Sequence, residues 1–417
     1  MLEHMCALER IKKHKSNSQD IIFADIPYAL GSTVYIDPKD GKPKYKKAKD
    51  FMEKWDMPDH NFWEEFFKEC NRVLKHGGRV MFFGIDRQLM LFNYYAVFAG
   101  LETQQSLYWY FLENFPKSVS ISKQLDKKQE AHELSDVYDG YKYSVAPLKQ
   151  VLETVMVFRK AIKTKSEIDD FIQFSNGDKS ISPTLWNISG NRVPAKDEEY
   201  ANSGRDSHTI NSKKTFNFGL TASISKPNEN GRYPSQLFCC TESANRLDQQ
   251  SGILKSGGMK KGMLRNMKEV NTFNAYTVHT VTNEVKKSQG GCSKILHTID
   301  YNDEELEYLI YDSKVSNFER YAGADNNDHP TLKPIKLIYK IAKLLKTPHA
   351  QNIFFPFAGA GSEIIGFEQA GYDTSLFVAS EINEKFVKIA KKRISFWKKF
   401  NINDIDKVKK YIQENKI

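Results

Sequence analysis

One stretch of the chain constrains its fold more than any other, namely Ile21-Ile22-Phe23-Ala24-Asp25-Ile26-Pro27-Tyr28. A short apolar run of this kind predicts a buried strand. We expect the strand to deliver Asp25, Pro27 and Tyr28 at its end. A fold for this chain therefore has to bring an acid, a proline-fixed backbone carbonyl and an aromatic ring together at one end of a strand.

These three groups suit a site that holds an extruded nucleobase and presents its exocyclic amine. Such an amine is a poor nucleophile, because its lone pair is delocalised into the ring. Two acceptors, the Asp25 carboxylate and the backbone carbonyl next to Pro27, would favour a tetrahedral nitrogen. Tyr28 would stack on the base, which is worth roughly 1–3 kcal/mol. The alternative is a plain turn, in which Pro27 fixes φ and Asp25 satisfies the backbone.

The size and charge of the chain bound its class. Its 417 residues are enough for two or more domains, and its formal net charge is +9 at pH 7. A basic balance fits binding to phosphate groups, which makes affinity fall steeply with salt. It fits equally well a lysine-rich surface that only keeps the protein in solution. Charge alone therefore leaves a nucleic-acid partner open.

Cysteine usage and hydropathy indicate the compartment. The five cysteines form no Cys-X-X-Cys pair and have no histidine at zinc spacing, so we expect free thiols, a reducing compartment and no metal. The longest apolar run, Leu89 to Leu101, contains Asn93 and is too short to span about 30 Å of hydrocarbon. The polar, charged N-terminus shows no signal peptide. We expect a cytoplasmic protein without a membrane partner.

Helix and strand patterns alternate in the first part of the chain. An amphipathic helical pattern lies within Met1 to Lys15, and a second runs from His60 to Leu74, which His76-Gly77-Gly78 would end. The elements that follow are a strand over Arg79–Gly84, a helix over Gln88–Ala99, and strands over Ser106–Phe111 and Leu152–Phe158. This alternation predicts a doubly wound α/β sheet.

The character of the sequence changes from about Thr164 to Glu319. Ser, Asn, Gly and Lys dominate there, and the periodicity weakens. The stretch Gly252 to Val270 carries five basic residues against a single acid, Glu269; the basic residues are Lys255, Lys260, Lys261, Arg265 and Lys268. We interpret the region as an insert that faces a duplex, and a partly disordered decoration is the alternative.

The α/β pattern returns at His329. The predicted elements are a helix over Thr331–Lys346, a strand over Asn352–Phe355, a small-residue turn over Pro356–Gly361, a helix capped by Ser362 that runs to Gln369, a strand over Ser375–Ala379 that ends near Glu381, and a helix over Asn383–Trp397.

This order of elements is the nucleoside-cofactor pattern. Gly359 and Gly361 would let the backbone approach the ligand, and Glu381, roughly 20 residues on, would accept both ribose hydroxyls. Ile364 stands where a dinucleotide site has its third glycine. That departure disfavours a pyrophosphate cofactor and suits S-adenosylmethionine.

Several motifs resemble those of beta-class DNA amino-methyltransferases, the adenine-N6 and cytosine-N4 family, and further stretches are similar to phage and prophage DNA adenine methylases. Asp25-Ile26-Pro27-Tyr28 resembles the catalytic motif, and the segment from His329 to Pro334 resembles the one before the cofactor strand. Phe355 to Gly361 resembles the cofactor loop, and Ser380 to Asn383 the acidic strand end. The resemblance spans nearly the whole chain.

The resemblance implies a Rossmann-like, S-adenosylmethionine-dependent methyltransferase fold. The catalytic motif precedes the cofactor motif, which implies a circularly permuted arrangement with an inserted target recognition domain. The expected division is residues 1–163 for the catalytic half, 164–324 for the insert and 325–417 for the cofactor half.

The resemblance also implies roles for individual residues. Asp25, Pro27 and Tyr28 would act at the target base, in an enzyme for which a leading Asp favours adenine N6 over cytosine N4. Lys333 would lie near the cofactor's methionine end. The full set expected at S-adenosylmethionine is Asp25, His329, Thr331, Lys333, Phe357, Gly359, Gly361, Ser362 and Glu381. The expected partner is double-stranded DNA, with a second copy as a possible one, in the nucleoid of a bacterial or phage-infected cell.

Two positions depart from the family pattern. Phe355 stands where the family usually has Asp, and Glu363, where a second Thr is usual, is the candidate to compensate. The departure at Phe355 motivates an alternative function, a catalytically silent DNA-binding protein on the same scaffold. Methylation of a protein glutamine or of RNA is a further alternative, because such enzymes use a similar motif.

Overall fold

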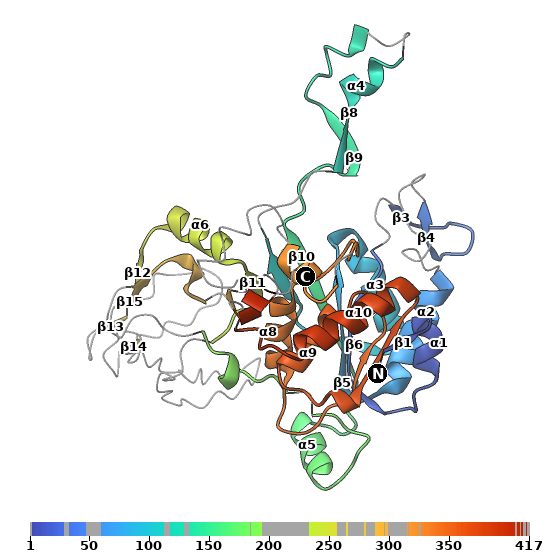
Figure 1. Ribbon diagram of the computed structural model, residues 1–417, viewed down its shortest axis with the longest axis vertical. Helices are drawn as coiled ribbons and strands as arrows, with labels where there is room; N and C mark the ends of the chain where they lie inside the picture. Colours follow the sequence, from blue (N-terminus) through green and yellow to red (C-terminus); the bar gives the residue numbers. More distant parts are fainter. Residues whose placement is uncertain are drawn as a thin grey trace. The chain divides into compact units, whose positions relative to one another are not determined.

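A computed structural model shows how the chain is arranged, and it divides the chain into two compact units (Figure 1). The first unit comprises residues 1–187, 236–240 and 299–417, and the second comprises residues 188–235 and 241–298. Within these ranges the structure describes residues 2–28, 33–46, 60–111, 117–128, 133–183, 185–193, 233–256, 264–265, 279–280, 288–295, 297–298, 315, 317–324, 327–404, 407–408, 410–411 and 414.

The strands of the first unit are β1 (Leu2–His4), β2 (Gln19–Asp25), β3 (Thr33–Ile36), β4 (Pro43–Lys46), β5 (Leu74–Gly84), β6 (Leu101–Thr103), β7 (Leu107–Tyr110), β8 (Lys117–Ser120), β9 (Lys142–Ala146), β10 (Leu152–Lys160), β11 (Leu237–Cys239), β17 (Ile353–Phe355) and β18 (Phe377–Glu381). Its helices are α1 (Ala7–Lys12), α2 (His60–Val73), α3 (Asp86–Phe98), α4 (Ile121–Leu125), α5 (Glu167–Ser175), α7 (Asn317–Tyr321), α8 (Ile335–Leu345), α9 (Ser362–Gln369) and α10 (Glu384–Trp397), with a 3-10 turn η7 (Thr374–Leu376).

The second unit contains one longer helix among its described residues, α6 (Thr241–Ser251). Its other described elements are short: η3 (Ser189–Asn191), β12 (Leu254–Ser256), β13 (Leu264–Arg265), β14 (His279–Thr280), β15 (Ser288–Gly290), η5 (Cys292–Ile295) and β16 (His297–Thr298). Within it, β12 pairs antiparallel with β15, and β13 with β14. Most of the basic stretch from 252 to 270 lies outside the described residues.

A mixed sheet forms the centre of the first unit, in the order β1-β18-β17-β2-β5-β10-β7-β11, with β6 pairing to β10. In this order, the neighbouring strands β1, β18, β17, β2 and β5 are all parallel to one another. β10 is antiparallel to both β5 and β7. The predicted α/β class and the parallel pairing of the Arg79–Gly84 strand are therefore confirmed, while the Leu152–Phe158 strand makes the sheet mixed.

β2 is the central strand that the sequence predicts, because six of its seven residues are buried. It lies between β17 and β5, with Ile21 opposite both Ile353 and Arg79. The side chains of Ile22 and Phe23 are fully buried. A strand covered on both faces needs this near-continuous apolar run.

The structure differs from the prediction at two strands near the start of the chain, β1, which was not predicted, and β5, which begins at Leu74 and not at Arg79. Within Met1–Lys15 only Ala7–Lys12 is helical, and Leu2–His4 is a strand that extends the sheet beside β18. The helix α2 ends at Val73, so Gly77 and Gly78 lie inside β5. They are needed there because an added Cβ would lie 2.6 Å from the Ser182 carbonyl oxygen at Gly77 and 2.8 Å from that of Lys75 at Gly78.

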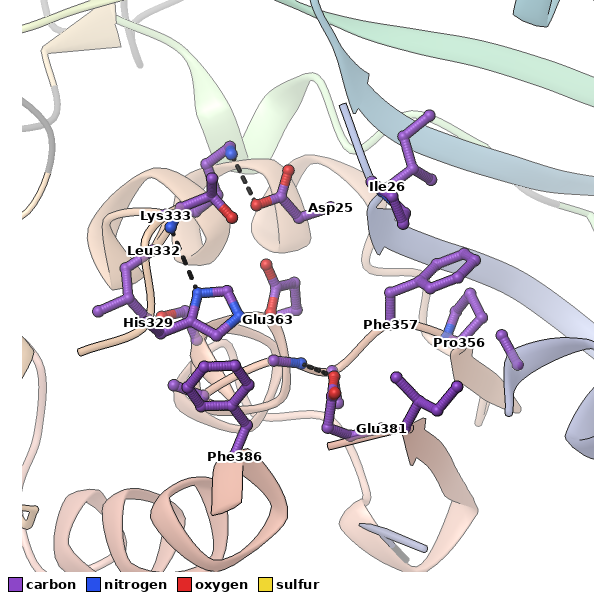
Figure 2. Close-up of a pocket in the computed structure, with 18 of the residues that line it drawn as sticks. Asp25, Ile26, His329, Leu332, Lys333, Pro356, Phe357, Glu363, Glu381 and Phe386 are labelled. Atoms are coloured by element: carbon purple, nitrogen blue, oxygen red, sulfur yellow. Dashed lines mark hydrogen bonds and ion pairs between the residues drawn. The ribbon is translucent and has the colours of Figure 1, made fainter. Parts of the chain in front are cut away.

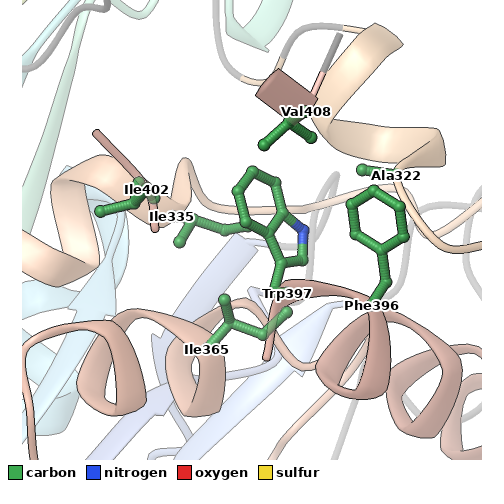
Figure 3. Close-up of a cluster of buried hydrophobic side chains, with 7 residues drawn as sticks. All are labelled: Ala322, Ile335, Ile365, Phe396, Trp397, Ile402 and Val408. Atoms are coloured by element: carbon green, nitrogen blue, oxygen red, sulfur yellow. The ribbon is translucent and has the colours of Figure 1, made fainter. Parts of the chain in front are cut away.

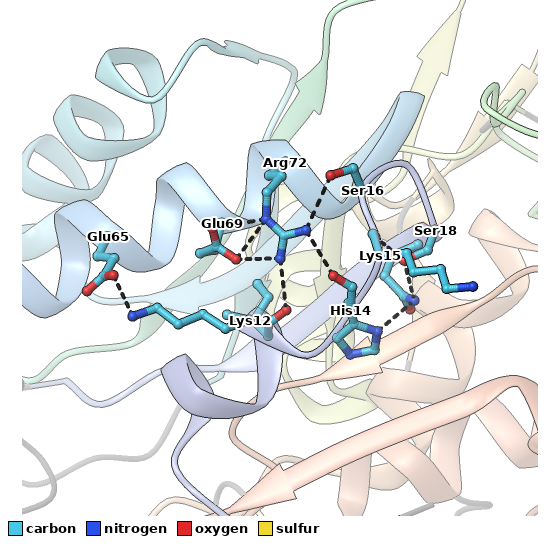
Figure 4. A network of polar contacts seen from close by, with 10 residues as sticks. Lys12, His14, Lys15, Ser16, Ser18, Glu65, Glu69 and Arg72 are labelled. Carbon is cyan, nitrogen blue, oxygen red and sulfur yellow. Dashed lines mark hydrogen bonds and ion pairs between the residues drawn. The ribbon is translucent and has the colours of Figure 1, made fainter.

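A polar cluster fixes the first helix against α2 (Figure 4). The Arg72 guanidinium donates to the Glu69 carboxylate and also to the backbone oxygens of His14 and Ile11, at 2.9 and 3.3 Å. Lys12 pairs with Glu65 at 2.5 Å. These contacts hold the backbone between α1 and β2 against α2, so they help to fix where β2 begins.

Helices α8, α9 and α10 pack around a buried tryptophan (Figure 3). Trp397 is fully buried in a hydrophobic cluster with Ile335, Ile365 and Phe396. The other members of this cluster are Ala322, Ile402 and Val408. The predicted helix over Thr331–Lys346 starts only at Ile335, after Pro334, so residues 331–334 are free to take the non-helical path that the site requires.

Candidate functional site

A pocket opens at the ends of β2, β17 and β18, entirely within the first unit. It holds about 840 Å³ of empty space, its opening to solvent included. Four segments line it: residues 25–28 after β2, residues 329 and 331–333 before α8, residues 356–360 with the start of α9, and residues 381–382 after β18. Cys6, Ala7, Phe62 and Phe386 complete the lining.

The sheet explains how segments more than 300 residues apart meet here. β2, β17 and β18 are parallel neighbours, so their carboxyl ends lie at one edge of the sheet. In open α/β sheets ligands bind in the crevice outside these ends. The structure therefore brings Asp25, at the end of a strand near the start of the chain, into the same pocket as Gly359 and Glu381.

Asp25 forms a buried ion pair at this edge. Its Oδ2 accepts a hydrogen bond from Lys333 Nζ at 2.7 Å (Figure 2). Lys333 Nζ also lies 3.4 Å from Oε2 of Glu153, a residue of β10. The Asp25 side chain is 9% exposed, and those of Lys333 and Glu153 are 2% and 0% exposed. One ammonium thus serves two buried carboxylates.

The ion pair determines the charge state of both partners. Burial raises the pKa of the Asp25 carboxyl, and the Lys333 charge opposes that rise. Burial alone would lower the pKa of Lys333, but the charges of Asp25 and Glu153 outweigh it and raise that pKa. Lys333 is therefore the cation that favours the ionised form of Asp25.

The second oxygen of Asp25 is an available acceptor. Oδ1 is buried and accepts no hydrogen bond from the described residues. The Tyr28 hydroxyl lies beside the carboxylate and lowers the Asp25 pKa, but it does not occupy Oδ1. A buried acceptor without a donor is unfavourable, and a ligand N–H that reaches it would remove that cost.

Tyr28 is held through both its hydroxyl and its backbone. Its hydroxyl donates to Glu153 Oε2 at 3.3 Å, and its backbone oxygen accepts from the Gln88 side chain. The Lys333 ammonium lies 4.9 Å from the centre of its ring. One part of the ring therefore faces this cation, and only the remaining ring surface along the pocket is available to stack on a ligand.

The turn after β17 approaches the ligand space closely. Gly359 has φ +47°, and a Cβ at this position would lie 2.7 Å from Nε2 of His329. His329 is itself buried against Phe386, with ring centres 4.5 Å apart. Burial, together with the nearby charges of Lys333, Arg393 and Arg320, lowers the pKa of His329 to about 3, so the ring is neutral. Only glycine fits this turn.

Glu381 is oriented by two backbone donors. Its Oε2 accepts from the Gly359 N–H at 2.9 Å and its Oε1 from the Asn383 N–H at 2.8 Å. Each oxygen keeps a further lone pair, so the carboxylate can still accept two hydroxyl hydrogens from a ribose. Burial raises the Glu381 pKa, and these backbone hydrogen bonds oppose the rise.

Gly361 and Ser362 serve the helix that follows. Gly361, at φ +86°, is the N-terminal cap of α9, so the expected cap by Ser362 is wrong. The Ser362 hydroxyl instead accepts from Arg393, whose guanidinium also donates to the Ala360 carbonyl at 2.6 Å. Ser362 lines the pocket, as do Thr331 and Phe357, whereas Gly361 does not line it and packs near Ala390 and Ile394.

Phe355 and Glu363 occupy different environments. The ring of Phe355 packs between Phe367 and Phe377, each at 5.3 Å, and does not line the pocket. Glu363, in the first turn of α9, lines the pocket and is 4% exposed. The acid of this region therefore comes from the helix, eight positions after Phe355.

Sequence reasoning missed Glu153 entirely as a site residue. The signal was present, because a carboxylate at the start of an apolar strand, as in Leu152 to Phe158, has to find a partner. Its partner Lys333 is distant in sequence, so only the sheet order reveals the pair.

Within the described part of the chain, no group of three or more His, Cys, Asp or Glu side chains is arranged to hold a metal ion. In the same residues, no helix has the length and apolar character needed to cross a bilayer.

A family model shows the family of this chain. The family model N6_N4_Mtase, described as DNA methylase, matches residues 19–392. Among solved structures, the M1.HpyAVI–SAM complex is 12% identical, with 94% of this chain and 98% of that chain covered and a TM-score of 0.37. PvuII DNA methyltransferase (cytosine-N4-specific) is 12% identical, with 98% and 89% covered and a TM-score of 0.40. No curated protein sequence matches the chain.

Proposed function

Because this chain belongs to the N6/N4 DNA methylase family, whose cofactor is S-adenosylmethionine, we propose that it methylates the N6 amine of an adenine flipped out of double-stranded DNA. The observation that carries the proposal is Oδ1 of Asp25, a buried acceptor without a donor in the wall of the pocket that Gly359 and Glu381 also line. An exocyclic amine is a ligand group that supplies such a donor.

The residues of the pocket fit the cofactor. Gly359 leaves room where a side chain would meet His329, and Glu381 presents two oriented oxygens for the ribose hydroxyls. The remaining residues of the proposed cofactor site are Asp25, Thr331, Lys333, Phe357 and Ser362, which line the pocket, and Gly361, which caps the adjoining helix. When bound, S-adenosylmethionine supplies an electrophilic methyl group on a sulfonium.

The chain's own residues would orient and activate the amine. Asp25 Oδ1 would accept a hydrogen bond from one N–H of the amine, and the backbone carbonyl before Pro27 would accept one from the other. The nitrogen then becomes more tetrahedral, and its lone pair is no longer delocalised into the ring. Lys333 favours the ionised form of Asp25 for this task, because its charge opposes the rise of the Asp25 pKa that burial causes. Asp25 Oδ1 would also accept the proton that the amine nitrogen gives up once it is methylated. The pocket-lining part of Tyr28 stacks on the base.

The second unit is proposed as the target recognition domain, within an insert over residues 164–324 and between halves formed by residues 1–163 and 325–417. This proposal is supported by the second unit being compact in itself, although residues 164–187 of the insert belong to the first unit. The order of the motifs, with Asp25 before Gly359, supports the circularly permuted arrangement. Pairing with a second copy and a nucleoid location stay predictions, which light scattering and imaging of a tagged protein would check.

The test is transfer of a labelled methyl group. The protein is incubated with unmethylated DNA of varied sequence and methyl-labelled S-adenosylmethionine, and the digested nucleosides are separated by mass spectrometry. We expect label in N6-methyladenine. Label in N4-methylcytosine would replace the adenine assignment by the cytosine one, and label only in RNA or protein supplied in parallel would overturn the DNA substrate. Absence of label from every macromolecule would favour a silent DNA-binding protein.

A further inference from the structure

Negative charge outweighs positive charge in the pocket. Its charged lining residues are three acids, Asp25, Glu363 and Glu381, against one cation, Lys333. Behind them Glu153 is also buried and shares the same ammonium. His329 adds no positive charge, because its pKa is lowered to about 3. A buried site with this imbalance is complementary to a ligand that brings a positive charge.

The three lining acids differ in how they are compensated. Asp25 has the Lys333 ammonium, and Glu381 has two backbone N–H donors. Glu363 forms no ion pair with any of the described residues, although it is 4% exposed and its own backbone N–H stabilises it. In Figure 2 its carboxyl group lies between His329 and the Asp25–Lys333 pair. Among these three acids, Glu363 is therefore the one that neither an ion pair nor a backbone N–H of another described residue compensates.

We propose that the Glu363 carboxylate binds the α-ammonium group of S-adenosylmethionine, a role that rests on the proposed function. The ammonium carries three N–H donors, and in a closed pocket each of them needs an acceptor. The sulfonium has no N–H or O–H donor and has to lie in line with the amine at Asp25. The ribose is assigned to Glu381, so Glu363 is the lining acid left for the ammonium.

The surroundings of Glu363 make its binding to a cation sensitive to pH. Burial, together with the charge of Asp25 at the end of β2, raises the pKa of Glu363 to about 8. Lys333, before α8, and Arg393, on α10, oppose the rise. Near pH 7 the carboxyl of the free pocket therefore carries a proton, which it has to release when an ammonium binds.

Isothermal titration calorimetry separates the possible roles. The proteins are the full chain, Glu363→Gln and a matched control, Glu368→Gln, which lies on the same helix outside the pocket. The ligands are S-adenosylmethionine, S-adenosylhomocysteine, which keeps the ammonium but lacks the sulfonium, and methylthioadenosine, which lacks the amino-acid part. We expect Glu363→Gln to weaken the first two roughly 10- to 100-fold and to leave methylthioadenosine unchanged.

Titration in buffers of different ionisation enthalpy supplies a measurement that needs no variant. The unmodified protein should release close to one proton on binding at pH 7, and its affinity should rise with pH until about pH 8. Glu363→Gln should release less and show a flatter profile. Glu368→Gln should match the unmodified protein in both respects.

The other outcomes are distinct. Equal affinities of the unmodified protein and Glu363→Gln for S-adenosylmethionine would overturn the inference while leaving the proposed function intact. Weakening of S-adenosylmethionine alone would assign Glu363 to the sulfonium and overturn the ammonium contact. Failure of the unmodified protein to bind S-adenosylmethionine at all would count against the proposed function itself.

Discussion

Lys333 Nζ lies 2.7 Å from Asp25 Oδ2, although 308 positions separate the two residues in the chain. The pair connects the segment before α8 to the end of β2 at the sheet edge where the pocket opens. It also sets the charge of the residue that we propose to act on the target amine. Several testable consequences depend on this contact.

Replacing Lys333 by Met should destabilise the protein strongly, because it leaves Asp25 and Glu153 buried without a cation. The expected loss is about 3–5 kcal/mol in the free energy of unfolding, measured by denaturant titration. Lys388→Met, at an exposed position of α10, should change it little. Adding Asp25→Asn to Lys333→Met should restore part of the stability, and a strictly additive further loss would contradict the pair.

Replacing Asp25 by Ala should abolish methyl transfer, while S-adenosylmethionine still binds through the other residues of its proposed site. The carboxylate is proposed to act on the amine, and the cofactor's ribose contacts are assigned to Glu381. We expect a loss of at least about 100-fold in single-turnover rate. The measurement pairs transfer of labelled methyl with calorimetry on the same preparation. Retained transfer would move the active site elsewhere in the chain.

Gly359→Ala should weaken S-adenosylmethionine binding by about tenfold or more, because its Cβ would force His329 or the turn to shift. The control is Gly41→Ala, which also has positive φ but meets nothing within 4 Å. Both variants bear a backbone cost of about 1–2 kcal/mol, so the comparison isolates the contact with His329. Similar affinities for the cofactor in the two variants would show that the close approach is unimportant.

The carboxyl of Glu363 should make the ligand-free protein less stable at high pH. The pKa of this carboxyl is ordinarily 4.5 and is about 8 in the folded protein. Between pH 4.5 and about pH 8, the folded state therefore holds a proton that the unfolded state releases. This contribution is fully present below pH 4.5 and is lost as pH rises through about 8. The unfolding free energy of the unmodified protein, relative to Glu363→Gln, should fall by up to about 1.4 kcal/mol per pH unit in that window.

The measurement is denaturant unfolding of both proteins from about pH 5 to about pH 9, with all other groups held in common. Taking the difference removes their titration. A flat difference would show that Glu363 keeps an ordinary pKa. Saturating S-adenosylmethionine should reduce the slope, since a bound ammonium stabilises the charged carboxylate.

The sequence predicts the elements whose patterns are local. The apolar run before Asp25, the face of α2 and the glycine turn with Glu381 at the next strand end are all recognisable from spacing alone, and the structure brings Asp25, Gly359 and Glu381 into one pocket. The α/β class follows from their alternation. Roles of the individual side chains stay predictions until the experiments above are done.

Features that depend on distant partners escaped prediction. Leu2–His4 is a strand only because the edge of β18 is available to pair with it. Glu153 belongs to the site only because Lys333 arrives from another part of the chain. Phe355 looks like a missing acid in the sequence, yet its ring fills a gap between Phe367 and Phe377 in the core. Local patterns carry no information about such neighbours.

The position of β2 between β17 and β5 has a consequence for biosynthesis. β5 begins 49 positions after the end of β2, whereas β17 begins 328 positions after it and leaves the ribosome much later. Until β17 is synthesised, one edge of the apolar strand β2 has no strand to pair with, so it can aggregate or bind chaperones. Refolding of the full-length protein should therefore be slow, since the middle of its sheet closes last.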